Sequence, residues 1–431
     1  MSADDRYDLV IYGATGFTGL RCVISYIKSP LFRDLTLAVA GRSETKLRKA
    51  LDDVSTETGV NTRDVAIIVA STEDDASLHA MAKKARVIVN AVGPYRLHGE
   101  AVVRAAVEEG ASHVDISGEP AFLEKMQQKY SQLAKEKGVY VVGACGWDSI
   151  PADLGVNFLK KNFPGELNHA ETFVQLVTGP AGYSFNAGTY QTLVLGIASV
   201  MSDGLGKIRR EIMPEKIPRP SVKPPKRGKC WKISEPELHG GFALPFMGSD
   251  KSIVQRTQYF QYVEEKQRPV LVETYIRIGS LLWAVLLGLW VGVFGLFCMW
   301  APTRKLLQKY PDICSFNMFK NSGPTREQME QAGFIYWFVG RGYSKKLPLD
   351  QEHEDKPDQR LVVTCRGPDA GYIATSGCVM SAALALLKDK EQLPKNGGVY
   401  TTASAFAHTR IYEYLESFNV KFRVEGNGAK I

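Results

Sequence analysis

A glycine-rich turn directly after the first apolar segment constrains the fold of this chain most strongly. Residues 7–12 have the pattern of a buried strand, and they run into a G-x-x-G-x-x-G turn that opens an amphipathic helix. In such a turn Gly13 permits the sharp change of direction, Gly16 lets backbone amides approach a pyrophosphate, and Gly19 allows close helix–sheet packing. A purely steric role is the alternative, but the position after a first strand predicts dinucleotide binding. The predicted phosphate-binding loop is Gly13, Ala14, Thr15, Gly16, Phe17, Thr18 and Gly19.

Residues 1–150 alternate short apolar segments with amphipathic helical ones. The strand-like segments are residues 7–12, 35–40, 65–70, 86–90, 112–116 and 139–143. Helical patterns fill the intervals, for example over residues 46–57 and 122–137. Because buried strands that alternate with helices of this length pair in parallel, the sequence predicts an α/β fold with an N-terminal Rossmann domain, a doubly wound parallel sheet.

The end of the second predicted strand indicates which nicotinamide cofactor the chain prefers. An NAD-selective site usually places Asp or Glu there for the ribose 2′-hydroxyl. Here the strand ends in Arg42 and Ser43, whereas Asp34 precedes the strand and cannot reach that position. A guanidinium and a hydroxyl suit a 2′-phosphate, so NADP(H) is favoured over NAD(H). Ser43 is also a suitable N-cap for the next helix.

Polar residues gather at the carboxyl ends of the later strands, where ligands bind in such sheets. Asn90, Ala91 and Gly93 follow the fourth strand and are predicted to lie on the nicotinamide side. The group that exchanges a proton during hydride transfer stays open among four candidates. These are Tyr95, Asp115, Cys145 and Asp148. Turn and helix-capping roles are the structural alternative, above all for Asp148.

The sequence does not contain the motifs of other catalytic classes or of metal sites. The seven cysteines are scattered without a C-x-x-C spacing, and the histidines show no ligand-like spacing with carboxylates, so we expect reduced thiols and no metal. The chain has no G-x-S-x-G, H-E-x-x-H or G-x-x-x-x-G-K-[ST] motif. The Tyr262-to-Lys266 spacing matches short-chain dehydrogenases, but it lies beyond the nucleotide domain and is interpreted as coincidence.

The net charge of +7 is concentrated in one proline-rich segment, residues 207–232. We expect this basic loop to be extended and without regular structure. It fits a solvated surface loop or attraction to anionic lipid headgroups. Nucleic acid is not an expected partner, because no aromatic or helical recognition pattern accompanies the charge. The acidic N-terminus lacks the features of a secretory signal, so the chain is expected to face the cytosol and not to be secreted.

The rest of the chain predicts a second, mixed α/β domain. Strand-like segments recur at residues 171–178, 270–278, 334–340 and 360–366, with helical patterns at 188–201, 249–259 and 374–388. The expected division is a nucleotide domain over residues 1–150 and a second domain over 151–277 that continues through 302–431. The last part is expected to return toward the first domain.

An apolar run without charges, residues 278–301, interrupts this second domain. As a helix it is about 36 Å long, enough to cross a hydrocarbon layer of about 30 Å. A span would divide strands that belong to one sheet, and cations flank both ends, so we favour a segment that enters one leaflet and returns. Gly288, Gly292 and Gly295 are expected to let it bend. A span, a buried helix and a homodimer interface remain the alternatives.

Several multi-residue motifs occur in a fixed order along nearly the whole chain. They are GATGFTG, AGRS, NAVGPYRLHGE, DISGE, GWDSIPADLG, PFMGSD, GPDAGY and GGVYTTASAF. With them the chain resembles the saccharopine dehydrogenase family, and within it the animal branch of saccharopine dehydrogenase-like oxidoreductases. The resemblance implies a Rossmann domain, a nicotinamide cofactor, hydride transfer at a carbon–nitrogen bond, and a location on membranes or lipid droplets.

Two features modify that expectation. Soluble saccharopine enzymes lack a long apolar run, which argues against saccharopine as the substrate. A bacterial trans-acting enoyl reductase shares the glycine-loop and G-W-D-S-like segments, so a lipid-like substrate with reduction at a C=C bond is the alternative. We therefore expect an NADP(H)-dependent oxidoreductase linked to lipid metabolism, or else a catalytically silent NADPH-binding scaffold on lipid droplets.

Overall fold

The computed structural model describes residues 5–220 and 222–430, with side chains described up to residue 425. The chain forms two compact units, each built from several segments. The first contains the chain up to Trp147, Leu205–Ile212 and Gly371–Phe418, and the second contains Asp148–Gly204, Met213–Ala370 and the chain from Asn419. The first unit thus ends close to the boundary predicted at residue 150 and includes two later segments.

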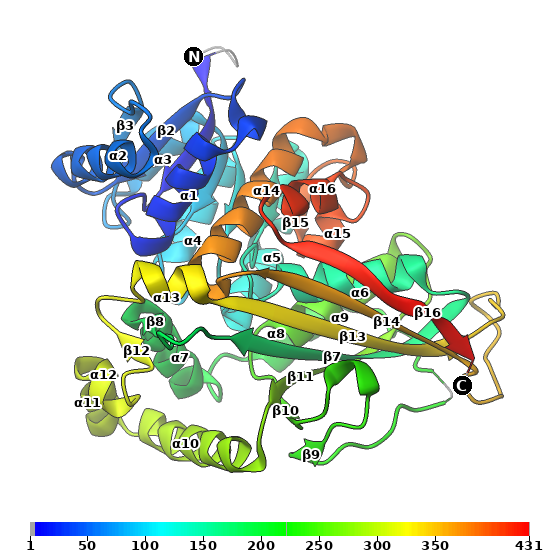
Figure 1. Ribbon diagram of the computed structural model, residues 1–431. Coiled ribbons are helices and arrows are strands. Elements are labelled where there is room, and N and C mark those ends of the chain that lie inside the picture. The colour runs from blue at the N-terminus through cyan, green and yellow to red at the C-terminus, as the bar shows by residue number, and fades with distance from the viewer. Residues whose placement is uncertain (1–4, 221, 431) are drawn as a thin grey trace. The chain divides into compact units, whose positions relative to one another are not determined.

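A seven-stranded parallel sheet forms the centre of the first unit, in the order β15-β6-β5-β4-β1-β2-β3. Figure 1 labels β2, β3 and β15 of this sheet. Its strands are β1 (Tyr7–Tyr12), β2 (Leu37–Gly41), β3 (Ala66–Val69), β4 (Ala85–Asn90), β5 (Ser112–Asp115), β6 (Tyr140–Val142) and β15 (Gly398–Tyr400). The predicted doubly wound parallel sheet is confirmed. The strands are almost fully buried because side chains of helices cover them.

The helices of this unit come from all three of its segments. They are α1 (Phe17–Lys28), α2 (Glu44–Thr58), α3 (Asp75–Lys83), α4 (Tyr95–Glu108), α5 (Pro120–Lys137), α8 (Leu205–Ile212), α14 (Thr375–Lys388), α15 (Thr402–Phe406) and α16 (Ile411–Ser417). The apolar helix α14 packs against α1, α16, β4 and β5. Its Gly377 lies so close to Phe418 that an added Cβ would be 2.6 Å from the Phe418 Cβ. The C-terminal segment therefore contributes part of the core of the nucleotide-binding unit.

A mixed seven-stranded sheet, in the order β16-β14-β13-β7-β11-β10-β9, forms the second unit. Its strands are β7 (Glu166–Val177), β9 (Trp231–Lys232), β10 (Phe242–Pro245), β11 (Leu271–Ile278), β13 (Gly333–Tyr343), β14 (Gln359–Pro368) and β16 (Lys421–Lys430). The helices α6 (Ile150–Asn162) and α9 (Asp250–Val263) pack on it, and an added Cβ at Gly155 of α6 would overlap the ring of Phe338. Strands before and after the apolar run belong to this one sheet, as expected.

A small helical module is attached to this sheet by two segments, one that follows β7 and one between β11 and β13. It combines four helices with the short pair β8 (Phe185–Asn186) and β12 (Phe319–Lys320), and α13 (Arg326–Gln331) follows it. The helices are α7 (Ala187–Ser199), α10 (Leu281–Met299), α11 (Ala301–Lys309) and α12 (Pro311–Cys314). Its core consists of Tyr190, Val194, Phe294, Cys298, Leu307 and Phe319.

The expected bend at the glycines of the apolar run is wrong. The helix α10 continues through Gly288, Gly292 and Gly295 without a break, and the chain changes direction only at Trp300, before Pro302 opens α11. Glycine removes no backbone hydrogen bond from a helix, whereas the φ/ψ of Trp300 (−102°, 130°) is extended and ends the helix.

Candidate functional site

The glycine-rich loop joins β1 to α1 with its backbone exposed at the helix N-terminus. Gly13 has φ +88°, which side chains disfavour, and a Cβ there would lie 2.7 Å from Val92 Cγ2. A Cβ at Gly19 would overlap the carbonyl oxygen of Gly13. Gly16 is the N-cap of α1, and no side chain caps this helix. The first N–H groups of α1 are therefore available for an anion.

Arg42 and Ser43 follow β2 at the same sheet edge, because β2 pairs in parallel with β1. Arg42 is exposed and makes no ion pair with any residue that the structure describes. The Ser43 hydroxyl accepts a hydrogen bond from the backbone N–H of Lys46 (3.3 Å), so it caps α2 and keeps its own proton for another acceptor. This geometry is compatible with both predicted roles of Ser43, the N-cap of α2 and a ligand of the 2′-phosphate.

Asn90 lies fully buried at the end of β4 and organises the turn behind it. Its side-chain oxygen accepts a hydrogen bond from Val92 N (3.0 Å), and its backbone carbonyl accepts one from the Tyr95 hydroxyl (2.8 Å). Ala91 N donates to the carbonyl of Tyr12 on β1 (2.9 Å). The segment from Asn90 to Gly93 is thereby fixed beside the glycine-rich loop.

Tyr95 begins α4 and is held in place rather than left free. Its ring is buried against Phe122 (5.6 Å between centroids), and its hydroxyl is bound to the Asn90 carbonyl. Burial first, and then the nearby Asp115, raise the pKa of Tyr95 well above its usual value. The hydroxyl is therefore protonated and already donates to the backbone.

Glu119 is a buried carboxylate that sequence reasoning did not single out. It accepts hydrogen bonds from the backbone N–H groups of Tyr95 (2.8 Å) and Arg96 (3.0 Å), and thus caps α4 from 23 to 24 residues further along the chain. The Arg96 guanidinium lies 3.7 Å from it. An acid directly before Pro120 normally serves its own helix, so the sequence contains little signal for this longer-range role.

Asp115, at the end of β5, is the candidate residue whose pKa lies nearest to neutrality. Its carboxylate accepts hydrogen bonds from Ser117 N (2.9 Å) and Ala144 N (3.1 Å). Burial raises the pKa of Asp115 to about 7, against the effect of these donors. His113 Nδ1 lies 3.7 Å from the carboxylate, and burial lowers the pKa of His113 to about 3, so that imidazole is neutral.

Cys145 lies beside Asp115 after β6. Its backbone N–H donates to the Asp115 carbonyl (2.7 Å), and its thiol donates to the Val142 carbonyl (3.2 Å). Burial raises the pKa of this thiol well above its usual value, so it is not a thiolate. The preceding Ala144 has φ +57°, a conformation that costs a residue with a Cβ about 1 kcal/mol or more. The Asp115 carboxylate holds it there.

Asp148 belongs to the second unit and has different partners from the other three candidates. Its carboxyl group is within hydrogen-bonding reach of Asp250, whose other oxygen accepts from the Tyr336 hydroxyl (3.0 Å). Burial raises the pKa of both acids, and the charge of Asp148 adds to the effect on Asp250. The two acids are suited to share one proton. They are 102 positions apart, so the pairing is not apparent from the sequence.

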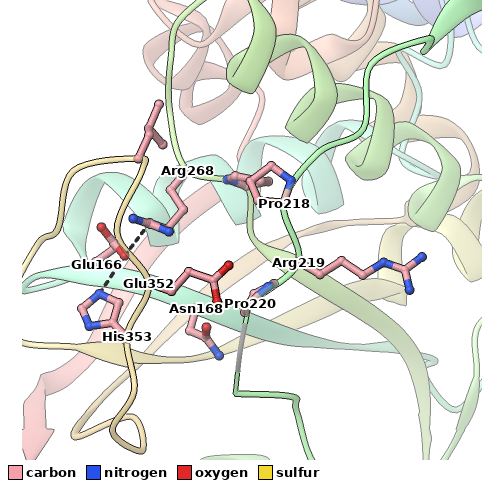
Figure 2. A pocket seen from close by; sticks show the side chains of 10 residues that line it. Glu166, Asn168, Pro218, Arg219, Pro220, Arg268, Glu352 and His353 are labelled. Atoms are coloured by element: carbon pink, nitrogen blue, oxygen red, sulfur yellow. Dashed lines mark hydrogen bonds and ion pairs between the residues drawn. The ribbon is translucent and has the colours of Figure 1, made fainter.

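A small pocket in the second unit is structural in character. Figure 2 shows Glu166 between Arg268 (2.7 Å) and His353 (2.9 Å). The His353 ring also stacks on Tyr343, with 3.6 Å between ring centroids. Arg268 also donates to the Pro348 carbonyl (2.7 Å). These contacts fasten the loop between β13 and β14. The pocket is lined by Glu166, Asn168, Pro218, Arg219, Pro220, Arg268, Pro269, Leu349, Glu352 and His353.

The basic segment differs from the expected loop without regular structure. Its first part belongs to α8, where Arg209 forms a bidentate pair with the fully buried Glu124 (2.8 to 3.1 Å). Further along, Arg227 pairs with the buried Glu171 (2.8 Å) and stacks on Trp231. Two of its cations therefore neutralise buried acids of the protein itself.

Among the described residues, no His, Cys, Asp or Glu cluster could hold a metal ion.

The residues of the first unit fit a dinucleotide phosphate. The uncapped N-terminus of α1 lies beside two glycines that admit no Cβ, and the exposed Arg42 is free of ion pairs among described residues. A glycine cradle followed by a cation at the end of β2 defines an NADP-binding Rossmann protein. A family model described as the saccharopine dehydrogenase NADP binding domain matches residues 9–142. The cofactor is accordingly NADP(H).

Full-length relatives define the family more closely. A human protein named saccharopine dehydrogenase-like oxidoreductase is 38% identical, over 98% of this chain and 99% of its own. A Caenorhabditis elegans protein named lipid droplet localized protein is 60% identical, over 97% of this chain and 98% of its own. This chain belongs to the saccharopine dehydrogenase-like oxidoreductase family. Apo saccharopine dehydrogenase (L-Glu forming) from Saccharomyces cerevisiae shares the fold, with a TM-score of 0.52, 11% identity and coverage of 97% and 100%.

Proposed function

We propose that the chain is an NADP(H)-dependent oxidoreductase that works on the cytosol-facing surface of a membrane or lipid droplet. The reaction is hydride transfer at a C–N or C=C bond of a lipid-like substrate, which links the protein to lipid metabolism. The observation that carries this proposal is the combination, in one chain, of an NADP-type glycine cradle with the exposed apolar helix α10. The lipid droplet localized relative supports the same location.

The cofactor-binding residues have distinct proposed roles. The amides at Gly16 to Gly19 bind the pyrophosphate, since they lie at the uncapped N-terminus of α1. Arg42 and Ser43 bind the 2′-phosphate, because a guanidinium and a hydroxyl are suitable donors to phosphate. Asn90, Ala91 and Gly93 line the nicotinamide side. NADP(H) supplies the hydride chemistry when bound, and these residues position it.

Asp115 is the strongest candidate for proton exchange among the four predicted residues. Its pKa near 7 permits both protonation states at physiological pH. The Tyr95 hydroxyl and the Cys145 thiol instead donate to backbone carbonyls. Asp148 shares its surroundings with Asp250 in the second unit.

Gly16→Asp tests the cofactor site without disturbing the fold. The N-cap dihedrals of Gly16 (φ −80°, ψ 164°) suit Asp, which is a favourable N-cap, whereas its Cβ would lie 3.2 Å from the Gly13 carbonyl oxygen, so the unliganded protein should unfold at nearly the same temperature. The new carboxylate should repel the pyrophosphate and abolish the thermal shift caused by NADPH. Gly206→Asp, at an exposed helix glycine with no heavy atom closer than 3.9 Å to an added Cβ, is the matched control. An unchanged NADPH shift in Gly16→Asp would refute the cofactor assignment.

A catalytically silent NADPH-binding scaffold is the second candidate function. The observation that favours it is the burial of Tyr95, Asp115 and Cys145, whose polar groups are satisfied by the backbone. Oxidation of NADPH with a panel of imines and enoyl lipids distinguishes the two functions. Turnover that is lost in Asp115→Asn supports the enzyme, whereas NADPH binding without turnover of any substrate favours the scaffold.

A further inference from the structure

A second apolar feature lies beyond the uncharged run. Residues 313–318, which we term the Phe316 turn, comprise the end of α12 and its connection to β12. Phe316 is 84% exposed and Ile313 is 72% exposed, so both are more open to solvent than most residues of α10. The sequence pattern does not indicate this apolar exposure, because the turn is short and follows the charged helix α11.

The Phe316 turn lies beside the apolar helix. The indole N–H of Trp290, in the middle of α10, donates to the backbone carbonyl of Cys314 (3.4 Å). Cys314 ends α12 and is the immediate neighbour of Ile313. The helix α11 packs against α10 and α12, which makes the three helices one continuous structure. The Phe316 turn and α10, both of which carry exposed apolar side chains, are therefore neighbours in one module.

The backbone of the turn holds Phe316 in a conformation that bulky residues rarely adopt. Phe316 has φ +53° and Asn317 has φ +62°, both in the left-handed region. Hydrogen bonds from Asn317 N to the Asp312 carbonyl (2.7 Å) and from Phe319 N to the Ser315 hydroxyl (2.9 Å) fix the turn. Glycine or asparagine would fit this position with less strain. In this conformation the Phe316 ring is exposed to solvent and does not contribute to the packing of the fold.

We propose that the Phe316 turn is a second lipid contact, which inserts Phe316 and Ile313 into the phospholipid monolayer of a lipid droplet beside α10. The inference rests on the proposed lipid association and extends it to a site outside the apolar run. The exposed Lys305 and Lys309 of α11 lie between the two contacts along the chain and meet the phosphate groups. An aromatic ring next to cations suits the interface between headgroups and acyl chains.

A lipid surface fits these features better than a second copy of the chain does. The exposed Lys305 and Lys309 are complemented by lipid phosphates, whereas a second copy of the chain would have to supply acidic side chains opposite both of them. The apolar side chains also protrude from a convex helix and a turn instead of lining a groove. A monolayer adapts to such a shape, whereas a protein partner would have to match it.

Phe316→Gly tests the proposal with little risk to folding, because glycine relieves the left-handed strain while it removes the ring. Binding is measured by flotation with triolein droplets coated with phosphatidylcholine, and folding by thermal unfolding. We expect the affinity for droplets to fall about tenfold, with no loss of thermal stability. Ile313→Ser should weaken binding in the same direction. Val60→Ser, at an exposed apolar residue of the first unit, is the control and should bind like the unchanged protein.

The outcomes separate this inference from the proposed lipid association. If Phe316→Gly floats like the unchanged protein while Leu296→Asp in α10 is lost from the droplets, the second contact is overturned and the association stands. If both variants float like the unchanged protein, neither α10 nor the Phe316 turn carries the association and the proposal is overturned. If the unchanged protein itself does not float, the proposed lipid association fails. If sedimentation shows that Phe316→Gly converts a dimer into a monomer without affecting flotation, the turn is a subunit contact and the proposal is overturned.

Discussion

Among the residues that the structure describes, two helices are long and apolar enough to cross a membrane, and they have opposite surroundings. The α10 segment Leu281–Met299 has a mean hydropathy of 2.3 and is 17% buried, whereas the segment Ala370–Lys388, which contains α14, has a mean hydropathy of 1.6 and is 83% buried. Length and composition alone cannot distinguish them. Their packing assigns α14 to the core of the nucleotide-binding unit and leaves most of α10 without a protein partner.

The buried stripe of α10 is narrow. Ala284, Phe294 and Cys298 are its buried residues, and they face α7 and the sheet side of the module. This stripe extends along about 21 Å of the helix, so α10 lies along the protein rather than away from it. Strands β11 and β13, on either side of the module, both pair with β7. A single crossing of a bilayer at α10 would divide that sheet, so the fold is incompatible with one.

A Leu→Asp substitution should produce the largest difference in stability between a variant in α14 and a variant in α10. Leu384→Asp buries an unpaired carboxylate in α14, where Leu384 is fully buried, and should cost about 4 kcal/mol or more of stability. Leu296→Asp, at a residue that is 73% exposed, should change stability by less than about 0.5 kcal/mol and yet release the protein from droplets. Thermal unfolding and flotation of both variants check this. Severe unfolding of Leu296→Asp would show that α10 is a core helix.

Glycine-to-alanine substitutions should give a smaller effect with opposite signs. In α14 the Cβ of Gly377→Ala would lie 2.6 Å from Phe418 Cβ, and we expect a loss of about 1–3 kcal/mol. In α10 an added Cβ at Gly292 meets no heavy atom within 4 Å, so Gly292→Ala should stabilise by about 0.5–1 kcal/mol through helix propensity. Denaturant unfolding measures both values. A destabilised Gly292→Ala would indicate an unseen packing partner for α10.

Removal of one cation should give the smallest difference. Lys305→Ala, in α11 beside α10, should weaken binding to vesicles that contain phosphatidylserine by about 1 kcal/mol, with less effect in high salt. Lys388→Ala, at the end of α14, should leave that binding unchanged, because its ammonium group donates to the Leu31 carbonyl (2.7 Å) in the first unit. Vesicle sedimentation at two salt concentrations tests the pair. Equal losses for both lysines would mean that attraction to lipid is not localised at the module.

The regular part of the nucleotide-binding unit could be predicted from the sequence. Buried parallel strands are continuous apolar segments, so all six strands up to β6 were located within about two residues. β15 was missed because it has only the three residues Gly398–Tyr400, and they become a strand by pairing with β6. β16 was missed because its apolar alternation is limited to Phe422 and Val424 and is followed by a polar, glycine-containing stretch, so pairing with β14 defines it.

The candidate site could be predicted only as far as local motifs extend. The glycine-rich loop and the residues after β2 and β4 occupy the expected sheet edge, since strand order brings them there. The partners of the polar candidates depend on distant residues that no local pattern reveals. Glu119 caps α4, and Asp250 lies next to Asp148, which separates Asp148 from the other three. The bend expected in α10 was wrong because glycine permits a bend without imposing one.

The central claim is that the exposed face of α10 lies in lipid. An environment-sensitive NBD fluorophore on Leu296→Cys tests it directly, in a background in which Cys230 and Cys314, the cysteines that are not buried, are replaced by Ser. On addition of triolein droplets coated with phosphatidylcholine, the emission should shift to shorter wavelength and increase. The same label on Lys388→Cys should not respond. An unchanged spectrum at position 296, in protein that still binds NADPH, would contradict the account.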